Sequence, residues 1–227
     1  MLAAPVKARG GGFLLTHLTA IGETNGMKRI IRAVVMALLL APGMLWADDL
    51  RQQFKAGSDA YKAGDYETAY EIWLPIAELG DYATQFNFGL MFEAGQGVAQ
   101  DYAESARWYR LAAEQGFAQA QSNLGFMYHE GRGVAQDFAE AERWYRLAAE
   151  QGLAEAQHNL GFMYAHGNGV IQDYSTAPMW FNIAASNGYS DAVHNRDVIA
   201  DRMTPEAIAE AQSRARICIK SGYQDCD

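Results

Sequence analysis

Residues 101–136 read DYAESARWYRLAAEQGFAQAQSNLGFMYHEGRGVAQ, and residues 137–172 read DFAEAERWYRLAAEQGLAEAQHNLGFMYAHGNGVIQ. Position by position, 26 of the 36 residues agree. Weaker versions of the same pattern begin at Asp65 and Asp173, so four units start at an even spacing of 36 residues. Self-similarity at such a period indicates an array of stacked repeats, in which each unit contacts its neighbours.

Each unit predicts two helices when its positions are numbered 1 to 36 from the opening aspartate. Apolar or small side chains at positions 2, 5, 8, 9, 12 and 13 share one face of a first helix. The aspartate is a good N-cap, and a glutamate three residues later completes a capping-box signal. Ala, Leu and Met at positions 20, 24 and 27 stack on one face of a second helix. Glycines at position 16 and in the Gly-x-Gly-Val loop at positions 31 to 34 end the helices.

The two ends of the array depart from the repeated pattern, which indicates caps. Residues 48–80 predict a helix pair that lacks the longer glycine loop. At the other end, Arg196 and Asp197 replace the Leu-Gly of positions 24 and 25. We therefore expect residues 189–227 to form capping helices, because the terminal units of a repeat array must cover its open faces.

Residues 1–47 do not belong to the array. Residues 27–47 have a basic start, a short apolar run and Ala47 before a cut at Asp48, which is the pattern of a secretory signal peptide. The alternative is a membrane anchor, but the run is far shorter than the roughly 20 residues that a bilayer requires. Residues 1–26 precede a second methionine, and we interpret them as an over-extended start. The pattern predicts a periplasmic or secreted protein of the bacterial envelope with no integral anchor after cleavage.

Cleavage there would leave a strongly acidic chain. Five of the 18 basic residues and one of the 27 acidic residues precede residue 48, so 13 basic and 26 acidic side chains remain, a formal charge of −13. Such a surface repels a phosphate backbone, which argues against nucleic acid as a partner.

The only cysteines are Cys218 and Cys226. Behind a signal peptide, an isolated pair predicts a disulfide, which would pin the tail and stabilise the fold by roughly 2 to 3 kcal/mol. Two free thiols are the alternative. No histidine lies near them in the sequence, which argues against a metal site.

The stretches AQAQSNLGFMYHEGRGVAQDFAEAERWYRLAAEQG and AEAQHNLGFMY resemble Sel1-like repeats, which are relatives of the tetratricopeptide repeat. The resemblance covers residues 81–116, 117–152 and 153–188, after a tetratricopeptide-like pair at 48–80. It implies an all-α fold, a right-handed α/α solenoid of helix-turn-helix repeats with a concave groove. It also implies an adaptor or scaffold that binds another protein or peptide, and it names neither a partner nor a reaction. We expect no cofactor.

Positions 22, 26 and 29 of the second helix vary between units, whereas the buried positions repeat. This row, here called the groove row, falls roughly opposite the packed face and mixes aromatic, imidazole and acidic side chains. In the resembled solenoid this helix lines the groove, so the row suits a peptide or helix of a partner. The alternative is that the phenylalanines pack between units. The candidate binding residues are Phe86, Leu90, Glu93, Ser122, Phe126, His129, His158, Phe162 and His194.

Other chemistry finds less support in the sequence. His158 and His194 share position 22 of adjacent units, but helices stack about 10 Å apart, too far for two ligands of one metal ion. The glycine loops lack the preceding strand and following Lys-Ser or Lys-Thr of a phosphate-binding loop. Asparagine recurs at position 23, which we interpret as a structural hydrogen bond to a neighbouring backbone.

We expect no enzymatic activity, because no serine lies in a nucleophile elbow. Some Sel1 proteins assigned β-lactam binding or hydrolysis have a cysteine pair in each repeat, and this chain has none there. An enzyme or binder acting on the cell wall or on β-lactams is the second interpretation. A structural spacer in an envelope complex is the third.

Overall fold

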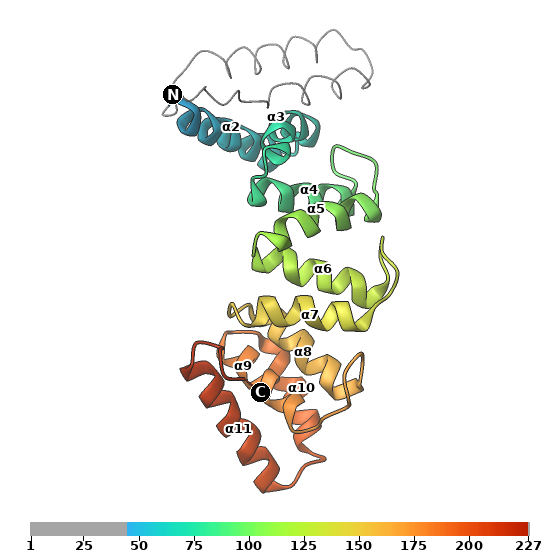
Figure 1. The fold of residues 1–227 in the computed structure, drawn as a ribbon, viewed down its shortest axis with the longest axis vertical. Helices are drawn as coiled ribbons and strands as arrows, with labels where there is room; N and C mark the ends of the chain where they lie inside the picture. The colour runs from blue at the N-terminus through green and yellow to red at the C-terminus, as the bar shows by residue number, and fades with distance from the viewer. Residues whose placement is uncertain (1–44, 227) are drawn as a thin grey trace, which may run out of the picture. The chain divides into compact units, whose positions relative to one another are not determined.

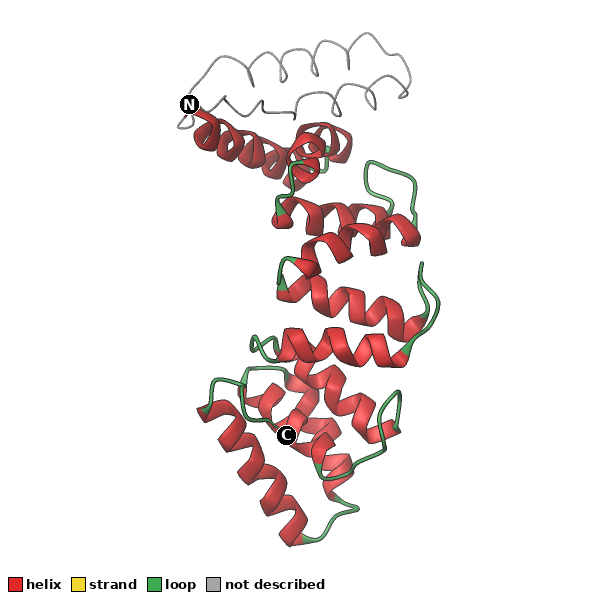
Figure 2. Ribbon diagram, viewed as in Figure 1, coloured by secondary structure: helices red, strands yellow, loops and turns green. Residues whose placement is uncertain are grey.

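The computed structural model describes residues 45–226, and this part of the chain is helical throughout, with no strand (Figure 2). The chain divides into two parts, residues 1–49 and 50–227, and the repeat array belongs to the second. Residues 1–44, with most of the predicted signal peptide, lie outside the described residues. No helix within residues 45–226 is long and apolar enough to cross a membrane.

Ten helices are described, and within residues 50–226 they form an all-α repeat solenoid (Figure 1). Each second helix packs on the first helix of the next unit, as α4 does on α5, α6 on α7 and α8 on α9. The helices are α2 (Leu45–Lys62), α3 (Tyr66–Glu78), α4 (Tyr82–Ala94), α5 (Tyr102–Glu114), α6 (Ala118–Glu130), α7 (Phe138–Ala149), α8 (Ala154–His166), α9 (Thr176–Ser186), α10 (Ser190–Ala200) and α11 (Pro205–Lys220).

Aspartates are the N-caps of α3, α5 and α7, as predicted, whereas the N-cap of α9 is Ser175. Oδ1 of Asp101 accepts the backbone N–H of Ala103 at 2.9 Å and of Glu104 at 3.0 Å, and Asp137 does the same for α7. These bonds satisfy amides that have no partner inside the helix. Helices α6 and α8 begin without a side-chain cap and end on a left-handed glycine, such as Gly131 with φ of 68°. In α4, by contrast, Asp81 caps the first turn.

The predicted core positions are buried. Leu124 and Met127 on α6 are at most 1% exposed, and their counterparts on α8 are the same. Glycine at position 25 receives the aromatic ring at position 9 of the next unit. A Cβ on Gly125 would lie 2.8 Å from Cδ1 of Tyr145, which explains why no side chain occurs there. The small residue and the ring therefore fix how closely two units approach.

A buried glutamine at position 21 links the units, which the sequence interpretation missed. Gln121 Nε2 donates to the carbonyl of Ala113 at 3.1 Å, and its Oε1 accepts from Gln151 Nε2 of the next unit at 2.8 Å. Gln85 with Gln115, and Gln157 with Asn187, repeat the arrangement. We call these three pairs the glutamine ladder. It satisfies one backbone carbonyl near the C-terminus of each of α3, α5 and α7, where carbonyls have no partner inside the helix.

The ladder ends at α10. Val193 occupies position 21 there and is 41% exposed. The last helix, α11, packs on α9 and does not take the place of a further unit (Figure 1). The predicted disulfide is confirmed, with the Cα atoms of Cys218 and Cys226 4.5 Å apart. The tail also contacts the ladder, because the hydroxyl of Tyr223 hydrogen bonds with Asn187.

Candidate functional site

The groove row is partly buried at its beginning. Ser122 is 2% exposed, and the ring of Phe86 lies 5.7 Å from that of Tyr109 and 5.1 Å from that of Phe117. Leu90 packs against the same cluster. The prediction that the row lies opposite the packed face is therefore wrong for Ser122. Position 22 adjoins the buried positions 20, 21 and 24, so neighbours cover a short side chain there.

Position 29 fills the space between one unit and the next, which we call the inter-unit site. In the first site Glu93 Oε2 accepts the hydroxyl of Tyr109 at 2.6 Å. Burial, followed by this bond to a carboxylate, raises the pKa of Tyr109. In the second site the ring of His129 lies 5.2 Å from that of Phe138 and hydrogen bonds with Asn168, which lies in the loop after α8. Both sites are closed by a side chain of the chain itself.

The third inter-unit site is open. Position 29 is Ala165, and position 9 is Phe181, which has no hydroxyl. A hollow of about 370 Å³ lies beside them, between α8, α9 and α10. Its residues are Phe162, Ala165, His166, Gln172, Tyr174, Phe181, His194, Asn195, Val198, Ile199 and Arg202.

Phe126 and Phe162 are the exposed aromatic members of the row, at 37% and 38%. The guanidinium of Arg132 lies 5.2 Å from the centroid of the Phe126 ring, and Phe162 stacks on His166 with centroids 4.0 Å apart. Phe162 also lies beside the preceding unit, with its ring centroid 6.3 Å from that of His129. More than a third of each surface stays available to a partner.

His158 is a structural histidine. Its ring stacks on Tyr189 at 4.7 Å. The amide nitrogen of Asn195 donates to Nε2 of the neutral imidazole at 2.7 Å. Burial lowers the pKa of His158, although Asp191 and Glu155 act in the opposite direction. The interpretation of position 23 as a backbone contact is wrong for Asn195, which bonds to this imidazole side chain.

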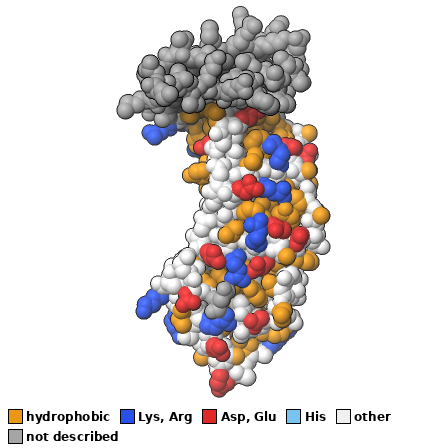
Figure 3. Space-filling view, in the orientation of Figure 1, with side chains coloured by type: hydrophobic (Ala, Val, Ile, Leu, Met, Phe, Trp, Pro, Cys, Tyr) orange, Lys and Arg blue, Asp and Glu red, His pale blue; other side chains and the backbone are white. Residues whose placement is uncertain are grey.

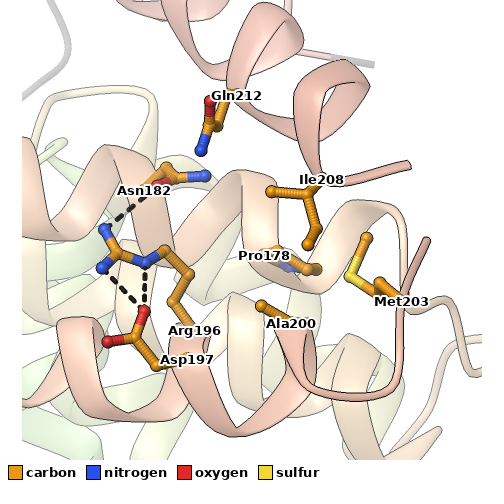
Figure 4. Close-up of a pocket in the computed structure, with 8 residues that line it drawn as sticks. All are labelled: Pro178, Asn182, Arg196, Asp197, Ala200, Met203, Ile208 and Gln212. Carbon is orange, nitrogen blue, oxygen red and sulfur yellow. Dashed lines mark hydrogen bonds and ion pairs between the residues drawn. The ribbon is translucent and has the colours of Figure 1, made fainter. Parts of the chain in front are cut away.

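A second hollow, of about 200 Å³, lies between α9, α10 and α11. Figure 4 shows Arg196 directed at Asn182 and Asp197, opposite the apolar side chains of Met203 and Ile208. Arg196 Nη2 lies 2.7 Å from Asp197 Oδ1, and Nη1 lies 3.4 Å from the side-chain oxygen of Asn182. The charge in this hollow is therefore already balanced.

Histidines and carboxylates are scattered over the described part of the chain. Within residues 45–226, no three His, Cys, Asp or Glu side chains are placed to hold a metal ion together. Acidic and basic side chains alternate with hydrophobic ones along the face seen in Figure 3.

Comparison with known proteins agrees with this geometry. The Sel1 repeat family model matches residues 83–117, 118–153 and 154–189. A Sel1 repeat protein from Oxalobacter formigenes is 35% identical with a TM-score of 0.61, over 66% of this chain and 59% of that one. A protective antigen of uropathogenic Escherichia coli with an SLR fold is 39% identical with a TM-score of 0.65, over 67% and 34%. No curated protein matches the chain.

This chain thus spans less than two thirds of the length of either solved structure. Both structures are repeat solenoids of the same kind, and this fold is a scaffold for protein–protein interaction. The even 36-residue spacing, the buried repeat positions and the family match agree, and the chain contains three Sel1 repeats.

Proposed function

We propose that this protein is an exported adaptor that binds another protein along the exposed part of the groove row. The observation that supports this most strongly is an apolar stripe at position 26. Phe126, Phe162 and Val198 occupy this position on consecutive second helices and are 37%, 38% and 46% exposed. Aligned apolar side chains, spaced by about one helix diameter of 10 Å, suit a helix or extended peptide laid across the units.

The side chains around the apolar stripe are also suited to binding a protein partner. Arg132 lies over Phe126, His129 lies beside Phe162, and His194 is exposed next to the third inter-unit site. Aromatic anchors with polar groups around them are typical of the centres of protein interfaces. Nucleic acid is a poor candidate partner, because the acidic chain repels a phosphate backbone.

Export is the second part of the proposal. The disulfide is stable in an oxidising compartment, and the N-terminal pattern resembles a signal peptide. The similar Escherichia coli protein is a protective antigen, which agrees with a location outside the cytosol.

Affinity capture from envelope extract tests the adaptor. The full chain would serve as bait beside Phe126→Ser/Phe162→Ser, with Leu79→Ser/Ile217→Ser as the matched control. These control residues are exposed apolar side chains outside the row, at 64% and 51%. We expect one protein to be retained by the parent and the control and lost by the row variant. Equal capture by all three baits would reject the groove and favour a spacer.

Cell fractionation tests export. The full chain expressed in Escherichia coli should accumulate in the periplasm with Asp48 at its N-terminus by mass spectrometry. A chain found only in the cytosol, with Met27 or Met1 retained, would contradict this part of the proposal.

A further inference from the structure

The three inter-unit sites are built from corresponding positions of the repeat, and the third holds a hollow. The third is bounded by positions 26, 29 and 30 of one unit and by positions 2, 9 and 22 of the next. Glu93 fills the first and His129 the second, whereas Ala165 leaves about 370 Å³ open in the third. At all three sites the glutamine at position 36 donates a hydrogen bond to the backbone carbonyl of position 29. Gln172 Nε2 donates to the carbonyl of Ala165 at 2.8 Å, as its counterparts do to the carbonyls of Glu93 and His129.

The open site has a distinct charge. None of the residues that line it is acidic, although the chain has 27 acidic against 18 basic side chains. Arg202 and the imidazoles of His166 and His194 surround the opening. Within residues 45–226, the side chains of Arg202 and His194 have no hydrogen-bond or ion-pair partner. An unpaired guanidinium on an acidic protein favours a negatively charged ligand group.

Apolar walls define the rest of the site. The rings of Phe162 and Phe181 and the side chains of Val198 and Ile199 line it beside Arg202, His166 and His194. A group that fits must therefore combine methylenes with a terminal anion. The first site shows such a group in place, because the carboxylate of Glu93 crosses the same space to reach Tyr109.

We propose that the third inter-unit site is a socket for a glutamate or aspartate side chain of the protein that binds the groove row. This inference rests on the proposed function and names the chemistry of the bound segment: an acidic peptide with apolar residues beside its carboxylate. The carboxylate pairs with Arg202 at the rim, and the apolar neighbours lie on Phe162 and Val198.

The first experiment needs no partner. Ala165→Glu places a carboxylate at the position of Glu93, and Ala165→Gln is its uncharged match. With Arg202 present we expect the Glu variant to melt about 1 to 3 °C above the Gln variant, as for one partly exposed ion pair. In an Arg202→Gln background the difference should disappear, while in an Arg216→Gln background it should remain. Equal melting temperatures of the Glu and Gln variants with Arg202 present would overturn the socket.

The second experiment uses random 12-residue peptides displayed on phage, selected on the full chain. We expect several-fold enrichment of Asp and Glu among the retained peptides. The enrichment should be lost on Arg202→Gln and on Ala165→Glu, and kept on the exposed control Arg216→Gln.

The outcomes separate the two proposals. Retained peptides that lack acidic enrichment but are lost on Phe126→Ser would reject the socket and leave the adaptor standing. Acidic enrichment that survives Arg202→Gln would also reject the socket. If no peptide is retained by any bait, while the melting difference disappears with Arg202→Gln, the socket chemistry stands and the peptide-binding groove fails.

Discussion

The middle of the array and its C-terminal end use the same repeat for different purposes. Between α6 and α8, His129 fills the inter-unit site and Gln121 joins its neighbour through the ladder. Between α8 and α10 the same positions hold Ala165 and Gln157, so the ladder continues while the site is open. The contacts that stack the units are therefore independent of the side chain that fills the inter-unit site. The residues that hold the units together are repeated, and those that decide what a site contains are free to differ.

Replacing Trp144 should have the largest effect on stability, because it disrupts the packing between units that both regions share. Trp144 is 5% exposed and packs into the cluster that contains Leu124 and Met127 of the preceding unit. We expect Trp144→Ala to lower the free energy of unfolding by about 3 to 5 kcal/mol. Chemical denaturation followed by circular dichroism would measure it. An unchanged midpoint would contradict the stacked arrangement.

Removing one step of the ladder should cost less. Gln121→Leu leaves the carbonyl of Ala113 and the amide of Gln151 without their partner, which we expect to cost about 1 to 3 kcal/mol. The matched change at the open end is Val193→Gln, which restores the residue where no further unit can donate to it. That variant should differ little from the parent. A similar shift in both would mean that the ladder does not join the units.

Capping differs between the middle and the end, and pH makes the difference measurable. Burial raises the pKa of Asp173, but hydrogen bonds from Ser175 and Thr176 outweigh it and hold the pKa at about 2. The carboxylate therefore contributes stability that is fully present above its unfolded pKa near 3.8 and lost as the pH falls through about 2.

We expect Asp173→Ala to cost about 1 kcal/mol at pH 7. The difference from the parent should shrink between pH 4 and pH 2 in thermal melts. Asp137→Ala is the matched variant in the middle, where the carboxylate accepts two backbone N–H groups. A constant difference for Asp173→Ala across that range would contradict the role of its carboxylate.

The smallest effect concerns His158, which burial keeps neutral. Its pKa is lowered in the folded state, so the unfolded chain takes up the proton first and stability falls as the pH drops below about 6.5. His158→Gln should show a slightly flatter dependence of Tm on pH between 7 and 5. The exposed His194, at the same position of the next unit, provides the control. Identical pH profiles for parent and His158→Gln would show that this imidazole does not titrate with folding.

The repeat made most of the fold predictable. Periodicity alone placed Leu124 and Met127 in the core and Asp101 and Asp137 at helix starts, because burial and capping depend on local spacing. The glutamine ladder was missed although Gln85, Gln121 and Gln157 recur at one position. A polar residue is ordinarily expected at the surface, and only the structure shows both of its buried partners.

The candidate site was less predictable, for a physical reason. Whether position 22 or 29 is open depends on side chains from three helices that meet across about 40 residues of sequence. Ser122 is covered because its neighbours are large, and the hollow at Ala165 exists because Phe181 lacks a hydroxyl and no long side chain crosses the gap. Variation along the row indicated where to look, but not which member is open.

Arg196 and Asp197 have one more consequence, for the length of the protein. Where other units present a glycine to receive an aromatic ring, α10 presents a charged side chain with its own Cβ, so nothing can stack beyond it. A further repeat unit can be added only upstream of α10, where it contributes its own glutamine at position 21 and its own glycine at position 25. Insertion of whole units upstream would therefore lengthen the array in steps of 36 residues and leave α10, α11 and the disulfide as its C-terminal cap.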